Sequence, residues 1–364
     1  MASIRLGGET LSARAWALPE TPAPETADDR DYVGYGDDLP HAQWPGGARI
    51  ALNVNFEGGG ERSVMDGDGT SEGVLTDIGA PALPGLRNPM VESVFEYGSR
   101  VGGWRLLKLF RRFEMKVCLL AVARAAERNP ALTRAYLDDG HELVSHHYRW
   151  LDYQLIPEAE EREHIRLAFE TFERVCGVAP VGWMTGRPGA NTRRLLVETG
   201  RLLYDRDALN DELPYWRMVG GRPHLVIPYS FETNDNRFDQ NHGFSNADDF
   251  ARYMIDGFDV LYAEGAERPR LMSLAVHDRL IGRPGRIAGL VRFLEHVRRH
   301  DRVWVATGRE IAEHWRLVHP APGLGGLRRR LIPTLAVSGC RASQHGTLKW
   351  NCGTSSTSSP SPRN

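Results

Sequence analysis

Short apolar runs alternate with longer amphipathic segments along most of the chain. Apolar runs bounded by turn residues are typical of buried strands, whereas apolar residues at every third or fourth position indicate helices. An alternation of the two predicts parallel strands joined by helical crossovers, and therefore an α/β fold. The predicted strands are 50–56, 116–122, 143–145, 181–184, 202–204, 225–229, 271–276 and 303–306.

Two of the intervening segments have clear helical spacing. Residues 104–110 place Trp104, Leu107 and Phe110 near one face, and residues 248–264 repeat that pattern with aromatic, Met and Leu side chains. Such stripes are expected to pack in the core and not to bind a cofactor.

The two ends differ from this pattern. Residues 1–30 are rich in Pro and acidic residues, and the chain beyond about 319 becomes rich in Gly, Arg and then Ser. Neither composition can bury much apolar surface. We therefore predict a flexible arm at 1–30, one barrel domain at 31–318 and a flexible tail at 319–364.

The charge balance excludes some partners. Forty-five basic and 47 acidic residues leave a net charge of −2, which is unlike a nucleic-acid or polybasic membrane-binding surface. Four cysteines form no CxxC pair, so no disulfide framework or zinc knuckle is indicated. No secretory signal and no apolar run long enough to span a membrane is present, so the predicted location is cytoplasmic.

Polar residues follow several of the predicted strands. Glu57, His146, Arg187, Asp205 and His277 each stand at or just beyond the C-terminal end of one of them. In a β/α barrel the loops at that face converge on the active site. We therefore expect these side chains to meet.

A metal site at this face would lack ligands. A His-x-x-x-His pair beginning at His146 would need a second imidazole where Trp150 stands, and an indole nitrogen cannot coordinate. A strand ending in paired carboxylates would need a second acid after Glu57, but Gly58 follows. The prediction is that no catalytic metal and no other cofactor is bound.

Local strings along residues 31–315 resemble one group of proteins. The chain is similar to the metal-independent branch of the polysaccharide deacetylase superfamily, which contains allantoinases and related cyclic imide hydrolases. The strings that carry the resemblance are residues 31–36 (DYVGYG), 92–100 (ESVFEYGSR), 145–154 (SHHYRWLDYQ), 185–187 (TGR), 191–194 (NTRR), 213–216 (LPYW), 233–235 (TND) and 280–286 (LIGRPGR).

The resemblance implies a distorted barrel of about seven strands and a homo-oligomer. It places Glu57 at the general-base position, makes His277 the group that protonates the leaving group, and makes His146 the counterpart of a metal-ligand histidine. Trp150 would then form a pocket wall. Gly58 departs from the Glu-Glu pair that allantoinases carry at this point, which affects the choice of substrate more than the mechanism.

Each assignment has a structural alternative. Glu57 could be a solvated carboxylate in a turn, and His146 a satisfied structural histidine. Arg187 could bind a carboxylate or oxyanion, or orient Glu57. Arg283 could brace the loop after His277 as well as bind substrate. Glu96 and Asp205 complete the set of predicted substrate-binding residues.

Hydrolysis without a metal favours an activated substrate. A metal lowers the pKa of bound water and polarises the carbonyl, and both aids are missing here. In a cyclic imide or hydantoin a second carbonyl stabilises the leaving nitrogen, so acid–base catalysis of about 10²–10⁴-fold per group can suffice. The sequence therefore predicts an allantoinase-like hydrolase of small cyclic amides. Its rivals are a metal-dependent carbohydrate deacetylase and a non-catalytic binding relative.

Overall fold

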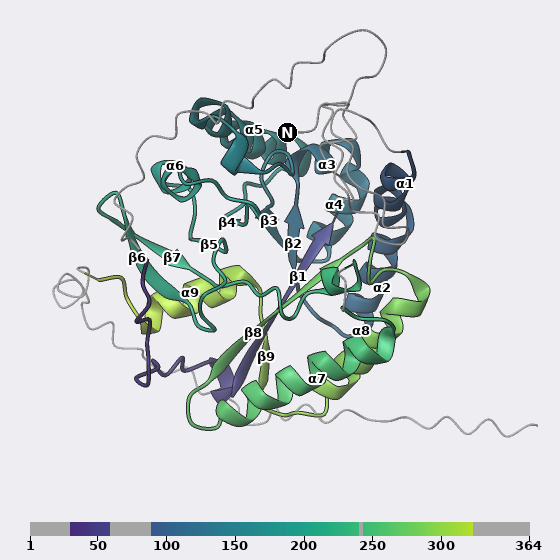
Figure 1. Ribbon diagram of the computed structural model, residues 1–364, viewed down its shortest axis with the longest axis vertical. Coiled ribbons are helices and arrows are strands. Elements are labelled where there is room, and N and C mark those ends of the chain that lie inside the picture. The colour runs from purple at the N-terminus through teal and green to yellow at the C-terminus, as the bar shows by residue number, and fades with distance from the viewer. Residues whose placement is uncertain (1–29, 59–88, 240–242, 323–364) are drawn as a thin grey trace, which may run out of the picture. The chain divides into compact units, whose positions relative to one another are not determined.

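The computed structural model describes residues 30–58, 89–239 and 243–322, which lie in one unit that runs to Pro322. Within them, nine strands form a single curved sheet with helices around it (Figure 1). The strands are β1 (Ile50–Gly58), β2 (Cys118–Ala121), β3 (Glu142–Ser145), β4 (Gly182–Trp183), β5 (Tyr204–Asp205), β6 (Tyr215–Val219), β7 (Arg222–Val226), β8 (Arg270–His277) and β9 (Val303–Val305). Apart from Arg30 and residues 319–322, the predicted arm and tail lie outside the described residues.

The strand order is β6-β7-β5-β4-β3-β2-β1-β8, and β9 also pairs with β1. The seven strands from β7 to β8 run parallel, and a bridge between Asn234 and Ala275 joins the segment after β7 to β8. This arrangement confirms the predicted distorted α/β barrel. Strand β6, antiparallel to β7, was not predicted, because its half-exposed residues show no apolar alternation.

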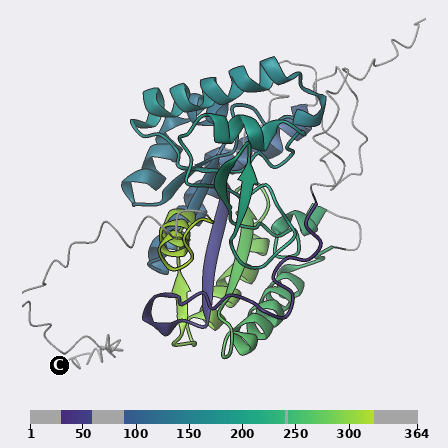
Figure 2. The same ribbon diagram turned by 90° about the vertical axis from the view of Figure 1, so that its left-hand side faces the viewer.

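Helices surround the sheet, and α5 and α7 lie on opposite sides of it in both views (Figures 1 and 2). The helices are α1 (Pro89–Tyr97), α2 (Gly103–Arg112), α3 (Ala123–Arg128), α4 (Pro130–Asp138), α5 (Glu158–Cys176), α6 (Thr192–Glu198), α7 (Ala247–Glu264), α8 (Pro284–Val297) and α9 (Gly308–Val318). Three of them begin with a side-chain cap: Asn129 for α4, Asn246 for α7, and a Thr307/Glu310 capping box for α9. Among the described helices, none is long and apolar enough to cross a membrane.

Strand β1 has an apolar outer face and a polar inner face. Phe56 points outward and stacks on Tyr136 of α4, with ring centroids 4.7 Å apart. Truncating a buried ring of this kind to alanine costs about 3–5 kcal/mol. Because successive side chains alternate, Asn53, Asn55 and Glu57 point into the barrel. The tightly packed outer face of β1 thus fixes the position of Glu57 on the inner face.

The loop after β8 is held by a close glycine contact. A π-helical segment, Gly98–Gly102 (η4), joins α1 to α2. A Cβ atom on Gly98 would collide with the Asp278 carboxylate, and one on Gly102 with the Asp278 carbonyl oxygen. Only glycine allows this approach, which fixes the chain directly after His277.

Candidate active site

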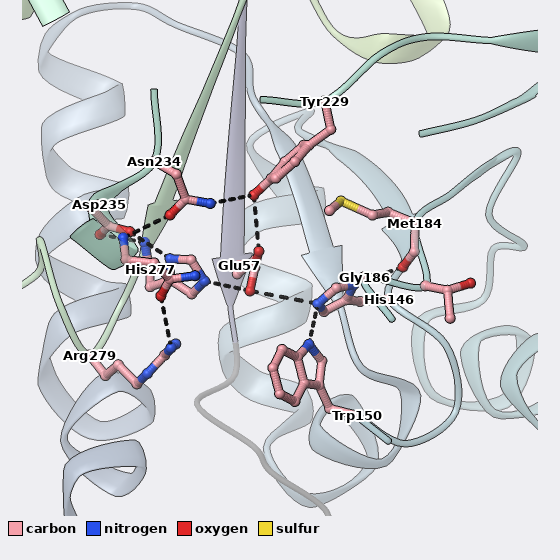
Figure 3. Close-up of polar contacts among 12 residues, drawn as sticks. Glu57, His146, Trp150, Met184, Gly186, Tyr229, Asn234, Asp235, His277 and Arg279 are labelled. Carbon is pink, nitrogen blue, oxygen red and sulfur yellow. Dashed lines mark hydrogen bonds and ion pairs between the residues drawn. The ribbon is translucent and has the colours of Figure 1, made fainter. Parts of the chain in front are cut away.

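Glu57 and His277 lie opposite each other on the adjacent strands β1 and β8. His277 Nε2 is 2.6 Å from Glu57 Oε2, and the two side chains are 1% and 13% exposed respectively. Both groups are therefore largely shielded from water. An ion pair in such a buried position is screened little by salt. Figure 3 shows the pair at the centre of the polar cluster.

Asp235 supports His277 from the other side. Its Oδ1 lies 2.5 Å from His277 Nδ1, and its Oδ2 accepts the backbone N–H groups of His277 at 2.8 Å and Ile281 at 3.0 Å. Asp235 is fully buried. Sequence reasoning gave this residue no role of its own, although it ends the string at 233–235. Its contact with His277 fixes the orientation of the imidazole ring.

The two carboxylates set the charge of this site. Burial works against the charge on His277, but Glu57 and Asp235 outweigh it and raise the pKa of the imidazole to about 9. Burial likewise opposes ionisation of Glu57, yet the charged imidazole of His277 holds its pKa well below the usual range. At neutral pH the pair is therefore a carboxylate next to an imidazolium.

Tyr229 is a second contact that the sequence did not reveal. Its hydroxyl donates to Glu57 Oε1 at 3.1 Å and accepts from Asn234 Nδ2, also at 3.1 Å (Figure 3). Burial, together with the Glu57 charge, raises the pKa of the phenol well above its ordinary value. The hydroxyl therefore keeps its proton and orients the carboxylate.

The hydrogen bonds of His146 define its protonation state. Nδ1 lies 2.7 Å from the carbonyl oxygen of Met184, which can only accept, so Nδ1 carries the hydrogen. Nε2 accepts the indole N–H of Trp150 at 2.5 Å and lies 3.6 Å from Glu57 Oε2. His146 is therefore held as the neutral Nδ1–H tautomer beside Glu57, with the Nε2 lone pair occupied.

These residues do not fit a catalytic metal. The lone pair with which His146 would coordinate receives the Trp150 N–H, and the indole offers no lone pair in return. A Cβ atom on Gly58 would lie 2.6 Å from the Phe56 ring and 2.7 Å from Leu119, so this position has no room for a second carboxylate. Among the described residues of this cluster, the donors that a metal would need are thus absent or already engaged.

A glycine turn holds His146 and Trp150 together. Gly186 has a φ of +81°, and a Cβ atom there would lie 2.8 Å from Cε1 of His146. The carboxylate of Asp207 accepts the backbone N–H groups of Thr185, at 2.8 and 3.0 Å, and Gly186, at 3.1 Å. Burial and the neighbouring Asp205 raise the pKa of Asp207 to about 6.

Arg187 follows this turn and lies over the indole ring of Trp150, with its guanidinium carbon 4.2 Å from the ring centroid. The two predicted binding residues therefore form one stacked wall next to His146. Glu57, His277, His146, Trp150 and Arg187 are the predicted site residues that the structure brings together.

The other three predicted binding residues contact other parts of the protein. Glu96 is about half exposed on α1 and faces Arg100 at 3.9 Å. Arg283 stacks on the ring of Tyr97 at 3.8 Å and donates to the carbonyl oxygen of Arg279, which matches the bracing alternative. Contact of Glu96 or Arg283 with substrate therefore stays a prediction.

Asp205 departs from the prediction more clearly. It is fully buried, and its carboxylate is taken by Arg193, at 2.8 and 2.9 Å, and by His224 Nε2, at 2.9 Å. Burial opposes its ionisation, but Arg193 and His224 hold the pKa well below the ordinary value. Its role is to fix α6 and β7 next to β5, and not to bind a ligand.

Arg206 occupies the inward position that was assigned to Asp205. It is fully buried and donates through Nη2 to Ser273 Oγ at 2.9 Å. The strand alternation is the cause, because Tyr204 and Arg206 face the barrel interior while Asp205 faces α6. Counting by two from Tyr204 could have identified Arg206 from the sequence.

The comparisons with known proteins define the class to which this barrel belongs. The family model of polysaccharide deacetylases matches residues 85–204. A provisionally named polysaccharide deacetylase of Schizosaccharomyces pombe is 38% identical over 313 residues, which cover 80% of this chain and 98% of the relative. The chain belongs to the polysaccharide deacetylase family, and is thus a hydrolase of carbon–nitrogen bonds.

Two solved structures match at a higher identity. One is a probable polysaccharide deacetylase from Pseudomonas aeruginosa PAO1, with 51% identity and a TM-score of 0.77, covering 80% of this chain and 99% of that one. The other is the Puue allantoinase, also with 51% identity and a TM-score of 0.77, covering 80% and 98%. The names of these relatives point to different substrates, so the choice depends on the site.

Proposed function

We propose that this protein is a metal-independent hydrolase that opens a cyclic C–N bond in a small amide, as in allantoin plus water to allantoate. The observation that carries the proposal is the contact between Trp150 and His146. A hydrogen-bond donor stands where a metal ion would have to bind, 2.5 Å from the nitrogen that would coordinate it. The similarity to a structure called an allantoinase supports the same reading.

In this mechanism Glu57 accepts a proton from the attacking water, whose oxygen bonds to the ring carbonyl carbon. Tyr229 holds Glu57 in place through its 3.1 Å hydrogen bond. The C–N bond then breaks and the imidazolium of His277 gives its proton to the leaving nitrogen. The proton on Glu57 passes to His277, 2.6 Å away, which restores the starting state.

Asp235 has a positioning role in this scheme. Its carboxylate contacts His277 Nδ1 and keeps the ring charged and aimed with Nε2 toward Glu57. Arg187, stacked on Trp150, is the candidate donor to the carbonyl oxygen as negative charge develops there. A cyclic imide suits these groups, because its leaving nitrogen needs less help than that of a sugar acetamide.

The second candidate is a carbohydrate N-deacetylase, which the names of the yeast and Pseudomonas relatives favour. A panel of cyclic amides and acetylated sugars, tested with the purified protein with and without a chelator, separates the two. We expect turnover of a cyclic amide that survives chelation. Deacetylation that is lost on chelation and restored by metal would refute the proposal.

Two substitutions test the acid–base pair. Glu57→Gln and His277→Ala should each lower kcat by about 10²-fold or more, since each removes a proton-transfer partner. The double variant should be little worse than the poorer single one, because both groups act on one transition state. Glu170→Gln, on the exposed face of α5, is the matched control and should keep full activity. Near-normal kcat in both single variants would overturn the assignment.

A further inference from the structure

A second group of ligating side chains lies outside the barrel, on the paired helices α7 and α8. Asp259 is on α7, His296 is in the last turn of α8, and His300 follows three residues after that helix. Their ligand atoms all lie within 4.8 Å of one another. Among the described residues, this is the only group of three His, Cys, Asp or Glu side chains that meets this limit.

The hydrogen bonds of His300 leave a lone pair for coordination. Its Nδ1 is 3.1 Å from the carbonyl oxygen of His296, which can only accept, so Nδ1 carries the hydrogen. Nε2 is then unprotonated in the neutral ring and lies 4.0 Å from Asp259 Oδ1. A hydrogen bond from Nδ1–H to a carbonyl oxygen is the usual arrangement of a metal-binding histidine.

The distances suit a small divalent cation. His296 Nε2 is 2.6 Å and His300 Nε2 is 4.0 Å from Asp259 Oδ1. Bond lengths of about 2.0–2.1 Å in a tetrahedral zinc site place its ligand atoms roughly 3.3 Å apart. The two distances to Asp259 each differ from this spacing by about 0.7 Å, and the two imidazole nitrogens lie within 4.8 Å of each other. Relative shifts of up to about 1.5 Å would therefore convert the present arrangement into a coordination sphere.

The surroundings also favour a cation. The His300 ring packs edge-on against Phe258 and Tyr262, with centroids 5.0 and 4.7 Å away, which restricts its movement. The site lies at the C-terminal end of α8, where the helix dipole places a partial negative charge. Asp259 is about half exposed, so an ion can enter from solvent and keep water as its remaining ligands.

We propose that Asp259, His296 and His300 bind one divalent cation of the zinc class, remote from the Glu57–His277 pair. This site is independent of the proposed function. The simpler alternative is an ion pair between Asp259 and His296 that joins α7 to α8. That alternative needs no contribution from His300, so His300 distinguishes the two.

The test is a titration of the metal-stripped full chain with Zn²⁺ by calorimetry, and with Co²⁺ by visible absorption. We expect one site per chain, with an affinity that falls about tenfold or more in His300→Gln and in Asp259→Asn. Asp248→Asn, three turns earlier on α7, is the matched control and should bind like the original protein. Glu57→Gln should also retain the site, because the reactive pair takes no part in it.

Three results would overturn the proposal: no Zn²⁺ bound at concentrations of about 0.1 mM, unchanged affinity in both ligand variants, or loss of the ion in Glu57→Gln alone. If a ligand variant is less stable, the comparison is repeated with His300→Phe, which keeps the ring packing against Phe258. The result also bears on any elemental analysis. Zinc that leaves with His300→Gln, without loss of turnover, belongs to this helix pair and not to the active site.

Discussion

The charge of His277 is the property of the site that experiment can test most directly. The imidazole lies between Glu57 and Asp235, and its pKa of about 9 compares with an ordinary value of 6.5. The difference of about 2.5 corresponds to roughly 3 kcal/mol of preference for the charged ring in the folded state. Arg279 opposes this effect, and burial opposes it more strongly.

Glu57→Gln is the informative substitution, because the charge of Glu57 makes the largest contribution that favours the charged His277 ring. Its amide keeps the shape of the side chain and removes the charge 2.6 Å from Nε2. We expect Glu57→Gln to lower the pKa of His277 from about 9. Asp235→Asn should also lower it. Glu170→Gln should leave it unchanged.

Proton NMR of the histidine Cε1–H resonances between about pH 6 and 10 measures this directly, with His277→Gln to assign the signal. Activity gives a second measure, since the reaction needs Glu57 ionised and His277 protonated. The alkaline limb of the kcat/KM profile should fall near pH 9 and should move to lower pH in Asp235→Asn, which keeps Glu57. A His277 pKa near 6.5 in the original protein, or a His277 pKa that is unchanged in Glu57→Gln, would refute the reasoning.

The same pKa has a consequence for stability. His277 binds its proton more tightly in the folded state, so its contribution is fully present below about pH 6.5 and is lost as the pH rises through about 9. Urea unfolding at pH 7 and pH 10 should show a loss in the original protein that is smaller in His277→Gln. Equal losses in the two proteins would contradict the assignment.

Two further substitutions address the turn beside His146. Gly186→Ala should lower the free energy of unfolding by at least about 1 kcal/mol, because φ is +81° and the new Cβ atom would lie 2.8 Å from the imidazole; an unchanged urea midpoint would contradict this. Trp150→Phe should cost about 0.5–1.5 kcal/mol by removing the N–H that His146 accepts. In that variant the Nε2 resonance of His146 should move, and an unchanged resonance would show that the hydrogen bond does not form.

The sequence reveals those parts of the site that depend on local patterns. It does not reveal contacts between residues that are far apart along the chain. Glu57, His146 and His277 follow apolar strands, and a barrel brings such positions together whatever the loops do. Tyr229 reaches Glu57 across 172 residues, and Asp235 reaches His277 across 42. Tyr229 ends a predicted strand and Asp235 ends the string at 233–235, but neither pattern identifies the residue that is contacted. Both contacts depend on how the segment after β7 lies against β8.

The sequence by itself determined the alternation of strands and helices, and the absence of a second imidazole at Trp150. These are local properties, set by spacing and side-chain chemistry. Only the tertiary structure decided that Arg206 faces the barrel interior while Asp205 pairs with Arg193, and that the Trp150 indole occupies the lone pair of His146. The physical reason is that orientation and protonation depend on which distant group supplies the partner, and that group is chosen by packing.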